Sequence, residues 1–202
     1  MAALASDRPT AARSVRAALL LALGLALLAA AVQWLGWAPA WEYRRAWLGD
    51  EPWRALSGHL AHLSWLHWAV NAVALVLVAA LLAPWMSARE QAATLAVTGL
   101  GVAGSLAVLW PEVAWYRGLS GALHGLFFAG VLLWWARAAR AARWLPGLLL
   151  AGGLVKLGLE QAWRFEPAPL AWLGAPAVAP AHLAGALVGL ACGCLALAWS
   201  RR

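Results

Sequence analysis

The sequence predicts an all-α, polytopic membrane protein, and three observations support this fold class. First, 64% of the 202 residues are hydrophobic and 11% are charged, with a mean hydropathy of +0.73, which is too apolar for a soluble domain of this size. Second, apolar runs of about 20 residues, the length that spans a hydrocarbon core, recur along the chain. Third, these runs lack the period-2 alternation of a β-barrel, so each is expected to be a helix that satisfies its own backbone hydrogen bonds.

Six transmembrane helices are expected, and they define one membrane domain over residues 17–202 after a short cytoplasmic segment, 1–16. The first run follows Arg13 and Arg16 and consists mainly of Ala and Leu. A secretory signal peptide ending near Ala29-Ala30-Ala31 is the alternative for this run. A membrane helix is favoured because the run is long enough to span and because its removal would leave five helices. The expected helices lie at 17–36, 60–83, 91–110, 120–136, 145–163 and 181–199.

The later runs differ from one another in their polar residues. The second begins with histidines, and the fourth begins with Ser120. The fifth contains Lys156 and Glu160, opposite charges spaced i, i+4 so that they can pair, and a structural ion pair is favoured over a catalytic one. The sixth begins near His182.

Charge predicts the orientation of these helices. With a cytoplasmic N-terminus, the outer loops carry equal numbers of arginines and acidic residues, so the whole net charge of +7 falls on the inner side. This is the positive-inside pattern, and a nucleic-acid partner is not expected. The inner charges are Arg8, Arg13, Arg16, Arg89, Arg137, Arg140, Arg143, Arg201 and Arg202 with Asp7 and Glu90; the outer ones are Arg44, Arg45, Arg54, Arg117 and Arg164 with Glu42, Asp50, Glu51, Glu112 and Glu166.

The polar residues inside the membrane gather at one depth. The second, fourth and sixth helices would all begin in the outer leaflet, and all 5 histidines of the chain lie at those ends. Polar groups in lipid are costly and tend to mark function. We therefore expect one common site, formed by His59, His62, His67 and Asn71 on the second helix, Ser120 and His124 on the fourth, and His182 on the sixth.

Ser120 and His182 are the residue types that a serine protease needs. Peptide hydrolysis requires a nucleophile, a base and donors aimed at the oxyanion. Ser120 would be the nucleophile, placed at a helix start beside unpaired backbone amides. The alternative for a membrane serine is a hydroxyl bonded back to its own helix.

His182 would be the base. Gly185 and Gly189 form a G-x-x-x-G on its helix, and Gly121 and Gly125 form another beside Ser120. Small residues at this spacing let two helices approach closely, which would bring the serine and the histidine together. No carboxylate is expected beside His182, so the sequence predicts a Ser-His dyad and not a triad.

Other members of the cluster have expected supporting roles. His67 and Asn71 are i, i+4 on one helical face, as two side-chain donors of an oxyanion hole would have to be. His62 is expected to brace the outer loop. A metal site of His59, His62 and His67 is disfavoured because no Cys, Asp or Glu accompanies them at ligand spacing, so neither a metal nor a cofactor is expected.

Together these residues resemble the rhomboid family of intramembrane serine proteases over about residues 50–195. The matching motifs are His62-x₄-His67-x₃-Asn71, Gly118-Leu119-Ser120-Gly121 and Ala181-His182-Leu183-Ala184-Gly185-x₃-Gly189, preceded by Trp53-Arg54. The resemblance implies a six-helix rhomboid-like bundle with Ser120 as nucleophile, His182 as base, and His67 and Asn71 as oxyanion-hole donors. It also implies that the loop with Trp53 and Arg54 lies at the membrane interface beside the substrate gate.

His124 departs from the common pattern, because many rhomboids carry at this place an aromatic residue that packs on the catalytic histidine. Its presence is similar to the rhombosortase branch, small bacterial rhomboids expected to process exported proteins with a C-terminal Gly-Gly, a hydrophobic helix and a basic tail. The implied partners are therefore such anchored membrane proteins and membrane lipid. His124 could compete as base, but His182 is favoured because it comes from a facing helix.

The resemblance also implies a location and leaves alternatives open. It places the protein in a bacterial inner membrane, with both termini cytoplasmic and the active site toward the periplasm. One alternative is a catalytically inactive rhomboid-like binder of transmembrane helices, although such proteins usually lack the serine or the histidine. The other is a transporter or channel, which would be expected to show broken helices or charges along a midplane path.

Overall fold

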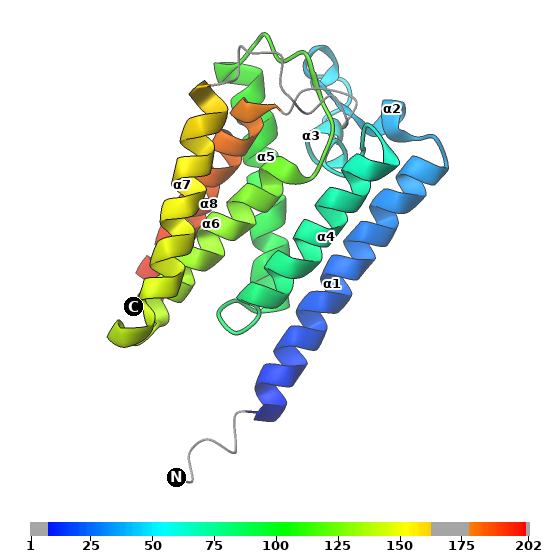
Figure 1. Ribbon diagram of the computed structural model, residues 1–202. Helices are drawn as coiled ribbons and strands as arrows, with labels where there is room; N and C mark the ends of the chain where they lie inside the picture. The colour runs from blue at the N-terminus through cyan, green and yellow to red at the C-terminus, as the bar shows by residue number, and fades with distance from the viewer. Residues whose placement is uncertain (1–7, 163–177, 201–202) are drawn as a thin grey trace.

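The computed structural model describes residues 8–162 and 178–200, and this part of the chain is mostly helical (Figure 1). Its long helices coincide with the apolar runs of the sequence, so the expected all-α class is confirmed. They are α1 (Arg8–Trp34), α4 (Trp65–Leu82), α5 (Ala88–Leu109), α6 (Ser120–Arg137), α7 (Trp144–Ala162) and α8 (Ala179–Trp199).

Within the described residues, 4 helices are long and apolar enough to cross a membrane: α1 over Ala12–Trp34, α4, α5 and α8. The polar residues of α6 and α7, among them Ser120, His124, Lys156 and Glu160, lower the hydropathy of these two helices. The chain is therefore a membrane protein, while a count of six spans stays a prediction.

The largest differences from the expected boundaries are at the starts of two helices. Helix α1 begins at Arg8, inside the segment expected to precede the membrane. Helix α4 begins at Trp65 and not at residue 60, because the hydroxyl of Ser64 caps it by accepting a hydrogen bond from the backbone N–H of His67. His59 and His62 therefore lie in the segment before α4 and not on it.

Several residues of the charge argument lie outside the described part of the chain. They are Asp7, Arg164, Glu166, Arg201 and Arg202. Residues 1–7 of the proposed N-terminal segment 1–16 and the expected end of the fifth helix at residue 163 lie outside it too.

The long helices alternate in direction, so α4, α6 and α8 all begin at the same end of the bundle (Figure 1). The short elements gather at that end: α2 (Ala38–Trp41), β1 (Tyr43–Arg44), the 3₁₀ turn Arg45–Trp47, α3 (Arg54–Ser57) and β2 (Trp115–Tyr116). A second 3₁₀ turn, Arg140–Ala142, joins α6 to α7 at the other end.

The two short strands connect the segment before α4 to the segment before α6. Strand β1 pairs antiparallel with β2, with Tyr43 opposite Tyr116. The buried carboxylate of Glu42 binds Arg44 through one oxygen and Arg117 through the other, at 2.5 Å each. The chain that leads into Ser120 is therefore held by both backbone pairing and charge.

Helices α6 and α8 pack closely through their glycines, as the two G-x-x-x-G motifs predict. A Cβ built on Gly185 would lie 1.9 Å from the carbonyl oxygen of Gly121, and one on Gly189 would lie 2.1 Å from that of Gly125. These distances are far inside van der Waals contact, so any side chain at either position would push the two helices apart.

Gly185→Ala is accordingly expected to destabilise the protein, by about 1–3 kcal/mol as is usual for an overpacked contact. Thermal unfolding in detergent measures the effect as a lower midpoint temperature. Gly158→Ala is the matched control, since a Cβ there meets nothing within 4 Å and alanine favours the helix by about 1 kcal/mol. Equal midpoints for the two variants would contradict the close packing.

Candidate active site

A cavity of about 570 Å³ includes residues from the first turns of α4, α6 and α8, and it continues along α4, α6 and α7. Its polar part consists of His67, Asn71, Ser120, His124, Lys156, Glu160 and His182. The rest is apolar and is lined by Val70, Ala74 and Val78 of α4, Leu123, Phe127 and Phe128 of α6, and Leu148, Leu149, Gly152 and Gly153 of α7.

The structure brings Ser120 and His182 into direct contact. Ser120 is the first residue of α6, and His182 lies in the first turn of α8. The close packing of these helices places Nε2 of His182 2.9 Å from Oγ of Ser120. A hydroxyl in this position can donate its proton to the imidazole, which is the contact that a nucleophile and its base require.

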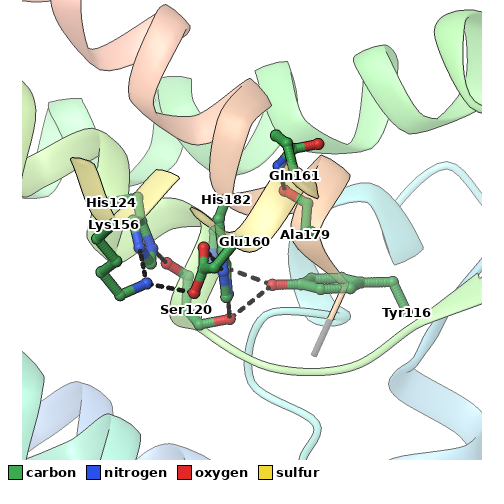
Figure 2. Close-up of polar contacts among 9 residues, drawn as sticks. Tyr116, Ser120, His124, Lys156, Glu160, Gln161, Ala179 and His182 are labelled. Carbon is green, nitrogen blue, oxygen red and sulfur yellow. Dashed lines mark hydrogen bonds and ion pairs between the residues drawn. The ribbon is translucent and has the colours of Figure 1, made fainter. Parts of the chain in front are cut away.

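Contrary to the sequence-based expectation, a carboxylate lies beside His182. Oε2 of Glu160 is 2.9 Å from Nδ1 of His182 (Figure 2). The other ring nitrogen, Nε2, faces Ser120. Glu160 lies in the last turn of α7, next to the start of α8, and Nε2 of Gln161 donates a hydrogen bond to the carbonyl of Ala179 between the two helices at 3.0 Å. The prediction that no carboxylate lies beside His182 is therefore wrong.

The i, i+4 pair of Lys156 and Glu160 is present, with Nζ 2.5 Å from Oε1. Lys156 also reaches α6, where its Nζ lies 3.0 Å from Nε2 of His124. The imidazole of His124 stacks on that of His182, with 4.2 Å between ring centroids and 18° between planes. His124 therefore packs on His182, and its Nδ1 contacts the backbone oxygen of Ser120 at 2.7 Å and not the hydroxyl.

Tyr116 is a member of the site that the sequence reasoning missed. Its hydroxyl accepts a hydrogen bond from the backbone N–H of Gly121 at 3.1 Å and lies 3.4 Å from Oγ of Ser120. Having accepted from Gly121, the phenol can donate its own hydrogen to Oγ, which leaves the hydrogen of Ser120 directed to His182. No short motif marks Tyr116, because strand pairing and not helix periodicity brings it to the site.

His67 and Asn71 both line the cavity from α4. The backbone N–H of Leu63 donates to Nδ1 of His67 at 3.4 Å, so the neutral ring carries its hydrogen on Nε2. The amide nitrogen of Asn71 donates to the carbonyl of His67 at 2.9 Å, and because that nitrogen has two hydrogens, this contact leaves one for a ligand in the cavity.

Gly118 is required where it stands for two reasons. Its φ is +124°, a conformation that residues with a side chain rarely adopt. A Cβ at this position would also lie 2.9 Å from Nε2 of His67. A glycine here lets the chain before Ser120 pass directly beside the His67 ring.

His59 and His62 support the segment before α4. The ring of His59 is buried between the carbonyl oxygens of Gly99 and Gly118, at 3.0 and 3.2 Å. His62 packs edge-on against His67, with 5.1 Å between centroids. Burial, and secondarily the proximity of His67, lowers the pKa of His62 to about 4, so it is neutral at pH 7.

Trp53 and Arg54 lie in the segment between α1 and α4, and neither is among the residues that line the cavity. Arg54 is buried, pairs with Glu51, and donates to the carbonyl of Glu42 at 2.9 Å. Trp53 is 57% exposed. Through these contacts Arg54 holds together parts of the segment between α1 and α4. The interfacial role of Trp53 and Arg54 stays a prediction.

Three potential metal ligands, His124, Glu160 and His182, have ligand atoms within 4.8 Å of one another. The ammonium of Lys156 contacts both His124 and Glu160, so a cation already occupies the space between two of the three groups. The donor set does not fit a metal ion well, because binding would require displacing this lysine.

The family of the chain is shown by comparison with known proteins. A search of curated proteins found no match. The model of the rhomboid domain matches residues 49–199, which is most of the chain and includes the helices that carry Ser120, His182 and the cavity. The family shown by this match is the one that the sequence motifs resemble, and the chain belongs to the rhomboid family.

Proposed function

We propose that the protein is an intramembrane serine endopeptidase in which Ser120 is the nucleophile and His182 the general base. Rhomboid proteins are typically intramembrane serine proteases. The single observation that carries the proposal is the 2.9 Å contact between Oγ of Ser120 and Nε2 of His182 at the polar end of the cavity. An inactive family member would have no need of this contact.

The reaction follows from the positions of the two side chains. Nε2 of His182 takes the hydroxyl proton while Oγ of Ser120 bonds to the scissile carbonyl carbon. When the C–N bond breaks, the proton passes from the imidazolium to the leaving amine. A water or an amine then attacks the acyl-enzyme and releases Ser120, and mass spectrometry of the new C-terminus distinguishes the two.

His67 and Asn71 would stabilise the oxyanion. Each carries a hydrogen on a nitrogen at the cavity, and Ser120 adds the unpaired backbone N–H expected at the first turn of a helix. Removing one oxyanion donor typically lowers kcat by about 10²- to 10³-fold.

The shape of the cavity supports a membrane-embedded substrate. Its apolar walls between α4 and α7 would accept a hydrophobic segment, and its polar end would hold the scissile bond. The protein would form one domain of six membrane-spanning helices in a bacterial inner membrane, with both termini cytoplasmic. Ser120 would then lie near the periplasmic surface, as would the cleavage site.

The proposed substrate class is supported by the presence of His124, in which the chain resembles the rhombosortase branch, and by the proposed depth of Ser120. We place the protein in the rhombosortase branch, whose substrates would carry Gly-Gly, an apolar helix and a basic tail at the C-terminus. Gly lowers helix stability by about 1 kcal/mol relative to Ala, so a Gly-Gly pair before the helix eases exposure of a backbone carbonyl to Ser120. The basic tail would orient the substrate by the positive-inside rule.

A reporter with Gly-Gly at this junction should be cleaved faster than one with Leu-Leu, with helix and tail unchanged. The measurement is the rate of product formation by purified protein in liposomes, at matched reporter density. Equal rates would reject the branch and the Gly-Gly substrate but leave the protease standing. If neither reporter is cleaved and no covalent labelling of Ser120 occurs, the inactive alternative holds.

A further inference from the structure

Lys156 and Glu160 connect the two stacked imidazoles of the site (Figure 2). Lys156 contacts His124 at 3.0 Å and Glu160 at 2.5 Å, and Glu160 contacts His182 at 2.9 Å. An ion pair that the sequence predicts to be structural therefore has both of its members in direct contact with histidines of the site.

Chemistry fixes the hydrogen positions on the His124 side of this chain of contacts. A backbone carbonyl oxygen only accepts, so Nδ1 of His124, 2.7 Å from the oxygen of Ser120, must donate. A lysine ammonium only donates, so Nε2 of His124 must accept from Lys156. Both nitrogens of a neutral His124 are thus satisfied in one tautomer.

The same reasoning fixes His182. The carboxylate of Glu160 accepts from Lys156 at Oε1 and offers Oε2 as a second acceptor, so Nδ1 of His182 must donate. In a neutral imidazole the other nitrogen then has a free electron pair, and this is Nε2, which faces Oγ of Ser120. The chain of hydrogen bonds begins at the backbone oxygen of Ser120 and ends at its hydroxyl.

We infer that Glu160 is a positioning residue that makes the catalytic pair a Ser-His-Glu triad, and that Lys156 holds Glu160 in place. This inference rests on the proposed function. Glu160 keeps His182 in the tautomer that can accept the serine proton, and its negative charge stabilises the imidazolium that forms during the reaction. Lys156 binds Oε1 of Glu160, and this contact leaves Oε2 to face Nδ1 of His182.

Glu160→Gln tests the role because of the lysine beside it. The ammonium of Lys156 would attract the amide oxygen of the glutamine, which turns the NH₂ group toward Nδ1 of His182. Nδ1 would then have to accept, the ring hydrogen would move to Nε2, and the base could no longer take the serine proton. In full-length protein in detergent, labelling by a fluorophosphonate should show kinact lowered by about 10²-fold or more, with KI unchanged.

The double variant Glu160→Gln with Lys156→Met provides a specific rescue. Without the ammonium, the amide is free to present its oxygen to Nδ1 and restore the productive tautomer. We expect kinact to rise by about tenfold over the single variant, the effect of about one well-placed hydrogen bond. A merely structural ion pair predicts no such gain, since both variants lack the pair.

Two further variants complete the experiment. Glu160→Asp keeps the charge and should retain more activity than Glu160→Gln, and it also serves if the glutamine variant does not fold. Glu112→Gln changes an exposed carboxylate after α5 and should leave kinact unaltered. Thermal midpoints of all variants report whether the fold is intact.

The outcomes separate this inference from the proposed function. Wild-type kinact in Glu160→Gln, or a double variant no faster than the single one, overturns the assignment of Glu160 and Lys156 and leaves Ser120 and His182 in place. A wild-type protein that is not labelled, or labelling that survives Ser120→Ala, overturns the proposed function and the inference with it.

Discussion

Ser120→Ala is expected to abolish both peptide cleavage and covalent labelling. The hydroxyl lies 2.9 Å from the imidazole of His182 at the polar end of the cavity, and no other serine lines that cavity in the described part of the chain. Removing the nucleophile of a serine protease lowers kcat by a factor on the order of 10⁶. Fluorophosphonate labelling, read by in-gel fluorescence and confirmed by mass spectrometry of the modified peptide, measures this loss.

The matched control is Ser105→Ala, a serine within α5. It should label at the wild-type rate, whereas Ser120→Ala should not label although its thermal midpoint is preserved. Undiminished labelling or cleavage in Ser120→Ala would remove this residue from the proposed mechanism.

His182→Ala is expected to lower turnover nearly as far as Ser120→Ala, because members of a catalytic unit fail together. His124→Ala should leave measurable activity. The two histidines stack, yet only His182 contacts the serine hydroxyl; His124 contacts the backbone oxygen of the same serine. Losing His124 removes a packing contact and a partner of Lys156, but the serine keeps its base.

Turnover of the Gly-Gly reporter in liposomes ranks the two variants, and fluorophosphonate labelling ranks them independently of the substrate. His124→Phe is the informative companion, because it keeps an aromatic ring against His182 and removes only the nitrogen contacts. A reversed ranking, with His124→Ala the more damaged, would transfer the role of base to His124.

Much of the site could be predicted because its chemistry depends on local sequence. The hydropathy of the runs set the helices, and the glycines at 185 and 189 predicted the face on which α8 meets α6. That face brings Ser120 and His182 together. The start of α4 was harder to predict, because the apolar run begins at residue 60, before the point where Ser64 caps the helix.

The contacts of Glu160 show where prediction from the sequence ends. The i, i+4 spacing gives its pair with Lys156, because both residues lie on one helix. Which neighbouring helix the pair faces depends on the rotation of α7 about its own axis and on how its last turn meets α8, where Gln161 bonds to Ala179. A weakly periodic apolar sequence does not encode that rotation.

The sequence by itself determined the helical membrane class and the family motifs, because hydropathy marks the helices. It also predicted that Ser120 and His182 would meet, because the glycine spacing marks the faces on which their two helices can pack closely. Only the tertiary structure decided that Glu160 lies at the far nitrogen of His182, that Tyr116 reaches Ser120, and that His124 stacks on the base and not on the nucleophile. These contacts join residues of different elements, and packing among several helices fixes them, which no spacing along one element can report.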